Sequence, residues 1–206
     1  MDAKTTIISR EALLAHFTLE RVVANPALFD PEKLNFLNGQ YIRLLSERAW
    51  LEKVAEWADR GLPPSIPRPL DATLLARAAP LLRERVGALT EVASLLAFLF
   101  TEGAPAYAPE LLWEKAGGGP ETARAILDAT IAALDRIPPA NWTEEAVETA
   151  IRGLEAPLGM KLRKFVSVLY VAVMGRPQGI PLFDSLVLLG RGEAMERLRS
   201  ARALAV

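Results

Sequence analysis

Apolar residues recur at the spacing of an α-helix along almost the whole chain. In one stretch Leu34, Leu37, Tyr41 and Leu44 follow this spacing, and we expect them to form one buried helical face. A second stripe comprises Ala123, Ile126, Leu127, Ile131 and Leu134. No alternating run is long enough to predict a sheet. Only 166–173 (VSVLYVAV) is ambiguous, because its β-branched content would suit a strand. The pattern predicts an all-α fold.

Capping residues and breakers place the ends of these helices. Asp30, Ser46 and Thr143 are expected N-caps, with Pro31 and Pro120 in first turns and Gly61 ending a helix. Pro80 is expected to break or kink the helix predicted from Asp71 to about Val86. Further helices are predicted over 90–100, 161–174 and 182–189, followed by a terminal helix that begins near Arg191.

Two Pro-rich connections divide the chain. Residues 61–69 (GLPPSIPRP) contain four prolines, and residues 103–109 form a second Pro/Ala-rich segment. We therefore expect two consecutive small helical bundles, the first over residues 46–104 and the second over residues 105–206. Residues 1–45 precede them.

Composition excludes several classes of function. The formal net charge is −1, from 24 basic and 25 acidic residues, so any nucleic-acid footprint must come from local clusters of Arg and Lys. The chain has no cysteine and one histidine, His16, which makes a zinc site or a Ser-His-Asp triad improbable. The most apolar stretch, 89–100, is too short to span a bilayer, and the N-terminus lacks a signal-peptide core. We expect a soluble, cytoplasmic protein with no membrane partner and no metal site.

Four segments, taken in order, resemble one protein family. Residues 29–43 read FDPEKLNFLNGQYIR, similar to the stretch that leads into the anticodon-binding region of bacterial glutamyl-tRNA synthetases. Three later segments match the same family: 80–91 (PLLRERVGALTE), 142–162 (WTEEAVETAIRGLEAPLGMKL) and 175–201 (GRPQGIPLFDSLVLLGRGEAMERLRSA). Each is weak alone, but together they cover most of residues 29–201.

The resemblance implies a tRNA-binding module that is not a catalyst by itself. Synthetases of this class I family hold ATP, Mg²⁺ and glutamate in an upstream catalytic half, whose motifs this chain lacks. The chain is therefore expected to be an isolated piece of such an enzyme, with residues 1–45 as the end of the domain that contacts the tRNA stem. The expected partner is tRNA-Glu, with no cofactor in this chain and no DNA partner, and the expected state is a monomer.

Arg85 is the leading candidate for reading the anticodon. It matches the arginine that reads the third anticodon base in discriminating members of the family. Cytosine presents two neighbouring acceptors, O2 and N3, that suit the paired donors of a guanidinium, whereas guanine presents donors at those positions. This match implies discrimination against tRNA-Gln. The alternative is a solvated arrangement in which Arg83 and Arg85 flank Glu84.

Other basic residues are candidates for the RNA backbone. Arg152 matches a basic residue of related enzymes, although an ion pair with Glu148 four residues earlier is equally plausible. Lys161, Arg163 and Lys164 form the densest basic cluster of the C-terminal half and suit phosphate binding.

The remaining candidates are less specific. Tyr170 stands where the family usually has an arginine, so it either stacks on an unpaired base or is a buried core residue. Lys33, Asn38 and Arg83 complete the candidate tRNA-binding residues, whereas Tyr41 on the apolar stripe fits the core. A helical protein-interaction module that keeps this ancestry is the alternative function, and it would not require the basic residues to share one face.

Overall fold

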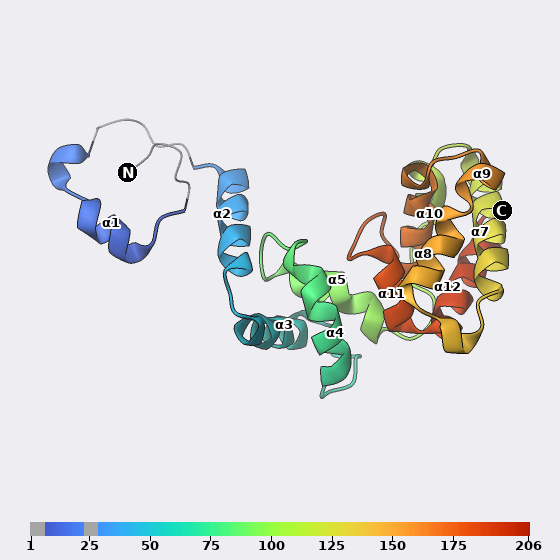
Figure 1. The fold of residues 1–206 in the computed structure, drawn as a ribbon, viewed down its shortest axis with the longest axis horizontal. Helices are drawn as coiled ribbons and strands as arrows, with labels where there is room; N and C mark the ends of the chain where they lie inside the picture. The colour runs from blue at the N-terminus through green and yellow to red at the C-terminus, as the bar shows by residue number, and fades with distance from the viewer. Residues whose placement is uncertain (1–6, 23–28) are drawn as a thin grey trace.

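The computed structural model describes residues 7–22 and 29–206, and the described part contains helices and connections but no strand. Parts of the predicted stem-contact segment, residues 1–6 and 23–28, lie outside the described residues. The all-α prediction is confirmed, including the ambiguous 166–173, which is helical. Figure 1 shows α1 (Arg10–His16) at one end of the long axis and a cluster of C-terminal helices, with the C-terminus, at the other. A short 3-10 turn (Leu19–Arg21) follows α1.

The first group of helices is α3 (Glu47–Gly61), α4 (Ala72–Arg83) and α5 (Glu91–Phe100), which pack on one another. The predicted caps are confirmed. The Ser46 side chain accepts a hydrogen bond from the Ala49 amide. Asp71, where the sequence predicted only the start of a helix, is the N-cap of α4 and accepts from two amides. Gly61 is the last residue of α3, and the Pro-rich 61–69 segment is a connection, as predicted.

Helix α2 (Pro31–Arg43) begins as predicted, but the apolar face that the sequence predicted to be buried is largely exposed. Asp30 caps it through the amides of Glu32 and Lys33. Leu34, Tyr41 and Leu44 are 52%, 49% and 69% exposed, whereas Gly39 and Ile42 are the buried residues of the helix. Helical spacing identifies an apolar stripe, but only tertiary packing decides whether another element covers it.

Pro80 does not break the helix, because α4 runs through this residue and ends at Arg83, before the predicted Val86. Proline removes one helical hydrogen bond, from its own missing amide. Around it, Ala78, Ala79 and Leu82 are buried, and the Trp50 indole donates to the Ala79 carbonyl at 2.7 Å. Packing against α3 therefore outweighs the local preference of proline.

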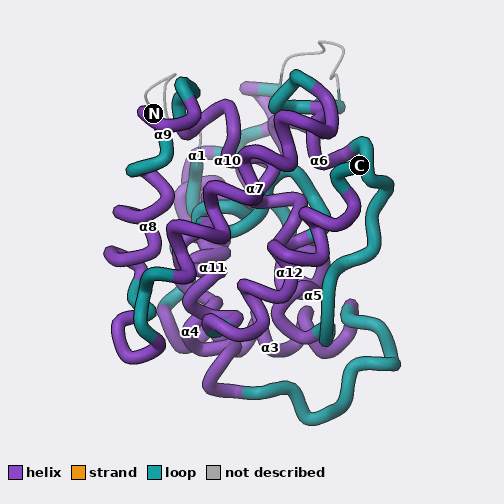
Figure 2. The backbone as a smooth tube through the Cα atoms, turned by 90° about the vertical axis from the view of Figure 1, so that its right-hand side faces the viewer, coloured by secondary structure: helices purple, strands orange, loops and turns teal. Residues whose placement is uncertain are grey.

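The second group contains two long helices, α7 (Gly119–Asp135) and α12 (Arg191–Leu204), which pack on each other. Around them lie α6 (Leu111–Glu114), α8 (Glu144–Arg152), α9 (Glu155–Leu158), α10 (Leu162–Met174) and α11 (Leu182–Leu189), with a 3-10 turn at Pro139–Asn141. Figure 2 shows these helices from the C-terminal end of the molecule. Thr143 caps α8 as predicted, and the apolar stripe of α7 is buried except for the half-buried Ile131.

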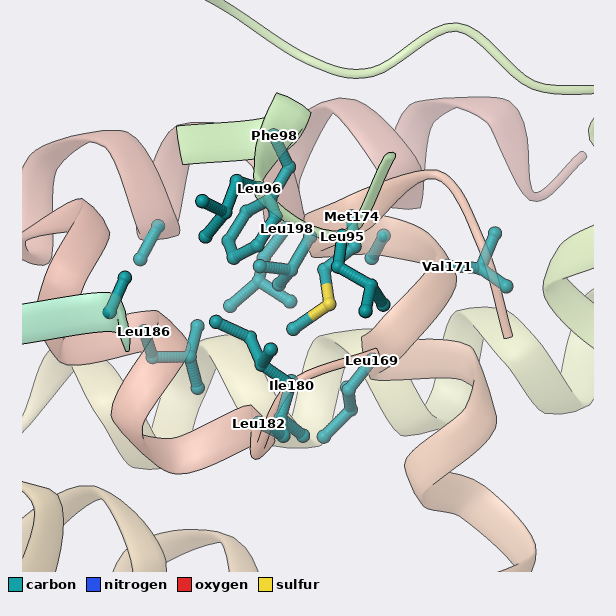
Figure 3. Packing of buried hydrophobic residues seen from close by; sticks show 14 of the residues in the cluster. Leu95, Leu96, Phe98, Leu169, Val171, Met174, Ile180, Leu182, Leu186 and Leu198 are labelled. Carbon is teal, nitrogen blue, oxygen red and sulfur yellow. The ribbon is translucent and has the colours of Figure 1, made fainter. Parts of the chain in front are cut away.

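Apolar packing continues from one group into the other. Figure 3 shows Leu95 and Leu96 of α5 gathered with Met174 at the end of α10, Ile180 of the next connection and Leu198 of α12. These residues are at most 8% exposed and belong to one hydrophobic cluster, and α11 also packs on α4. The two groups thus meet through a packed apolar junction. The division at residue 104 stays a prediction.

Arg197 of α12 is a buried charged residue at this junction, with 1% exposure. Its guanidinium donates to the Thr101 carbonyl at the end of α5 and to the Val173 carbonyl at the end of α10, at 2.7 and 2.9 Å. It also pairs with Glu193 one turn earlier, at 2.7 Å. One cation therefore satisfies the carboxyl ends of two helices from the two groups.

Candidate RNA-binding surface

A hollow of about 650 Å³ opens where the segment after α4 meets the second group of helices. We call it the basic hollow. Five of the predicted tRNA-binding residues line it: Arg85, Arg152, Lys161, Arg163 and Tyr170. They come from three segments of the chain: the connection after α4, the end of α8, and α10 with its N-cap. The other lining residues are Glu155, Leu162, Val166, Pro181, Leu182 and Phe183.

Arg85 reaches the basic hollow from the first group of helices. Its Nη1 donates to the carbonyl of Gly179, which precedes α11, at 3.2 Å. The expected alternative, with Arg83 and Arg85 around Glu84, is not what the structure shows, because Glu84 pairs with Arg43 at 2.9 Å. Within the described part of the chain Arg85 forms no ion pair. Since a guanidinium has five N–H donors, most of those of Arg85 are available to a ligand.

Arg152 forms the predicted ion pair and also lines the basic hollow. Its Nε donates to Glu148 at 2.7 Å, which is the predicted pair, and its guanidinium carbon lies 5.9 Å from the centroid of the Phe183 ring. An exposed pair of this kind stabilises the fold by at most about 1 kcal/mol. Arg152 therefore presents its positive charge at the basic hollow while remaining paired.

The start of α10 concentrates positive charge. Lys161, Arg163 and Lys164 are all exposed and form no ion pair with any described residue. Helices α3, α5 and α8 carry glutamates in their first turns, where negative charge suits the helix dipole, but α10 carries none. Cations at this end oppose the dipole, so helix stability does not account for them.

Two details refine the picture of this basic cluster. The Glu155 carboxylate accepts a hydrogen bond from the Leu162 amide at 2.7 Å, which caps α10 from outside the helix. Lys164 lies beside the basic hollow rather than in it. It lines an adjoining hollow of about 300 Å³ together with Lys161 and Arg163. Positive charge thus extends beyond the basic hollow toward Ala116 and Gly159.

Tyr170 is half-buried on α10, and its side chain lines the basic hollow. Burial raises the pKa of its hydroxyl, an effect that the nearby positive charge of Arg85 and hydrogen bonding to the Leu182 backbone oppose. The hydroxyl therefore remains protonated at neutral pH, as a neutral donor beside Arg85. The position combines features of both expected roles, a core contact and an aromatic surface open to a ligand.

The structure does not bring Lys33, Asn38 or Arg83 to the basic hollow. Lys33 is exposed on α2, and the Asn38 side chain donates to the Gly87 carbonyl at 2.6 Å. Arg83 donates to the carbonyls of Arg43 and Leu45 and so ties α4 to the connection between α2 and α3. The hydroxyl of Tyr41, expected in the core, is instead bonded to the Ile8 carbonyl at 3.1 Å.

A second, smaller hollow adjoins the first and contains residues that the sequence did not single out. This junction hollow, of about 260 Å³, is lined by Arg85, Glu91, Ser94, Leu95, Arg176, Gln178 and Gly179. Arg176 lies in segment 175–201, which resembles the family, but it is a single arginine in a connection and not part of a basic cluster. The sequence therefore did not mark it as a candidate. Only the fold shows that it faces Arg85 across a common space.

Two further properties concern the described residues alone. They contain no group of three or more His, Cys, Asp or Glu side chains arranged to hold a metal ion. None of their helices has the length and apolar character needed to cross a membrane.

Comparison with known proteins assigns this geometry to a family. A family model described as an anticodon binding domain matches residues 42–202. The chain belongs to the anticodon-binding domain family. The matched residues include α3 to α11 and therefore every residue that lines the basic hollow. The family membership does not favour the alternative of a protein-interaction module.

The relatives of this anticodon-binding domain are longer proteins, and the domain matches a part of each. It is 39% identical over 203 residues to a glutamate–tRNA ligase of Roseiflexus sp. (strain RS-1), and 34% identical over 204 residues to one of Paenarthrobacter aurescens. Each match covers 98% of this chain but 39% of the relative, so the chain spans about two fifths of their length.

Solved structures support the fold. A glutamate tRNA ligase from Elizabethkingia meningosepticum aligns with a TM-score of 0.71 at 22% identity, covering 96% of this chain and 37% of the other. The helical arrangement of this anticodon-binding domain is therefore shared with a ligase of that name.

Proposed function

We propose that this domain binds the anticodon stem and loop of tRNA-Glu and places the unpaired anticodon bases in the basic hollow. The observation that carries the proposal is the convergence of Arg85, Arg152, Lys161, Arg163 and Tyr170 on one surface. A protein-interaction module would not require this convergence. Phosphate groups need cations at their own spacing, and the cluster at the start of α10 supplies cations that the fold does not neutralise.

The fine specificity would come from Arg85. Its guanidinium is fixed by a bond to the Gly179 carbonyl, and its remaining donors suit the O2 and N3 acceptors of a cytosine in the third anticodon position. A guanine there would place its N1–H and N2–H donors against those of the arginine. The domain would therefore prefer tRNA-Glu over tRNA-Gln. Chemistry with ATP, Mg²⁺ and glutamate would belong to the rest of the polypeptide.

The test compares two RNA stem-loops that differ only in the third anticodon base, cytosine or guanine, alongside complete tRNA-Glu and tRNA-Gln. Binding of the unaltered chain and of Arg85→Gln would be measured by fluorescence anisotropy. Arg77→Gln is the matched control, because Arg77 is exposed on α4 and lines none of the hollows described above.

We expect the unaltered chain to prefer cytosine by about 5-fold or more, since a bidentate pair discriminates by about 1–3 kcal/mol. Arg85→Gln should reduce this preference to near unity, and Arg77→Gln should retain it. Equal affinity of the unaltered chain for both stem-loops would refute the role of Arg85. An affinity that does not fall as salt rises would refute the phosphate contacts.

A further inference from the structure

The junction hollow lies between two arginines that cross it in opposite directions. Arg85, from the first group of helices, donates to the Gly179 carbonyl of the second group at 3.2 Å. Arg176, from the second group, donates to the Ser94 carbonyl of α5 in the first group, also at 3.2 Å. These two hydrogen bonds join the two groups of helices in both directions. The first spans 94 positions of the chain and the second spans 82. Each guanidinium is held in place by one hydrogen bond to a backbone carbonyl and keeps further N–H donors for a ligand.

The one acidic residue of the junction hollow is engaged elsewhere. The two carboxylate oxygens of Glu91 accept hydrogen bonds from the backbone amides of Gly87 and Ala88, at 3.4 and 3.1 Å. No aromatic side chain lines this hollow, so it offers no surface on which a base would stack. Two guanidinium groups beside polar Ser94 and Gln178 instead suit a compact anion, and arginine binds phosphate through parallel N–H donors.

We propose that the junction hollow binds a phosphodiester group of the RNA backbone, with Arg176 as its principal ligand. The inference rests on the proposed function. Arg85 lines both hollows, so a strand that sets a base against Arg85 in the basic hollow carries its backbone past the junction hollow. Arg176 then adds affinity irrespective of the base, and Arg85 supplies the discrimination.

The experiment uses the same pair of stem-loops with Arg176→Gln, Arg176→Lys and the control Arg77→Gln, at several salt concentrations. Arg176→Gln should weaken binding of the cytosine and guanine stem-loops by the same factor, about 10-fold, and so leave the preference unchanged. The slope of log affinity against log salt should become shallower by about 1. Arg176→Lys should keep the slope, because lysine retains the charge.

A second readout identifies the phosphate. Methylphosphonate substitution removes the charge of one loop phosphate at a time. At one position the substitution should weaken binding to the unaltered chain by about 10-fold and have little further effect on Arg176→Gln. If Arg176 served only to join the two groups of helices, Arg176→Gln would alter stability while leaving the salt slope unchanged.

The outcomes separate the two proposals. An unchanged affinity and slope for Arg176→Gln, with the cytosine preference of the unaltered chain intact, overturns the phosphate site but leaves the proposed function standing. Loss of the preference in Arg176→Gln without a change in slope also overturns it, because Arg176 would then position Arg85. Failure of the unaltered chain to bind either stem-loop overturns both proposals.

Discussion

Replacing Arg197 by methionine tests whether one buried cation holds the two groups of helices together. Methionine has a similar length and keeps the apolar contacts of the arginine stem, but it removes every donor. The Val173 carbonyl, in a fully buried residue, and the Thr101 carbonyl would lose their bonds. Glu193, whose side chain is 29% exposed, would lose its ion-pair partner but retain contact with water.

The expected loss follows from these contacts. The two carbonyls that lose their donor would together cost about 2–6 kcal/mol. Each carbonyl that is left unsatisfied accounts for about 1–3 kcal/mol of it, and burial of the methionine offsets part. We therefore expect Arg197→Met to lower the free energy of unfolding by about 4 kcal/mol. With a urea dependence of about 2 kcal/mol/M, the unfolding midpoint would fall by about 2 M.

The matched control is Arg202→Met on the same helix. Arg202 pairs with Asp128 at 2.9 Å, and both side chains are about half exposed. This exposed pair should contribute little to stability, so its loss should shift the midpoint by about 0.5 M or less. Urea unfolding followed by far-ultraviolet circular dichroism measures both variants. Similar small shifts for the two arginines would refute the conclusion that Arg197 satisfies the ends of α5 and α10.

Two further predictions concern a close helix contact and a titrating group. An added Cβ at Gly61 would lie 2.5 Å from the Cβ of Ala93, so Gly61→Ala should separate α3 from α5 and destabilise the fold by about 1–3 kcal/mol. Gly192→Ala in α12, where nothing lies within 4 Å, should be neutral or stabilising by up to about 1 kcal/mol, and a destabilised Gly192→Ala or a stabilised Gly61→Ala in thermal unfolding would contradict this. Burial raises the pKa of Tyr107 to about 12 from an ordinary value of 10, because the fold favours the neutral hydroxyl over the phenolate. The stability gained from burying the neutral side chain is therefore complete below pH 10 and is lost as the pH rises through 12. Tyr107→Phe should therefore lose less stability than the unaltered chain between pH 10 and 12 in urea unfolding. Equal losses would contradict the raised pKa of Tyr107.

Local signals in the sequence predicted much of the fold. The caps at Asp30, Ser46 and Thr143 act through amides two or three residues away, so a short stretch of sequence contains the whole interaction. The helix continues through Pro80 without a break because its neighbours are buried and the Trp50 indole, 30 positions earlier, donates to the Ala79 carbonyl. The prediction that the apolar stripe of α2 is buried was wrong for a similar reason, since a pattern of apolar residues does not reveal what covers them.

The residues of the candidate site also divide into those that the sequence could identify and those that it could not. The basic cluster of 161–164 is visible in the sequence because its members are neighbours. Arg85 was found through resemblance, and residue type alone would not have separated it from Arg83, which faces the connection after α2. Arg176 could not be predicted, because its significance depends on a contact with a residue 82 positions away.

The start of α10 also constrains how this domain can change. Placing acidic residues at positions 163 and 164 would complement the helix dipole and should stabilise the helix by about 0.3–1 kcal/mol for each charge. The same changes would replace attraction for phosphate with repulsion. Selection for thermal stability and selection for RNA affinity therefore act in opposite directions on this turn. A search for stabilised variants that ignores binding would therefore tend to replace the basic residues at the start of α10.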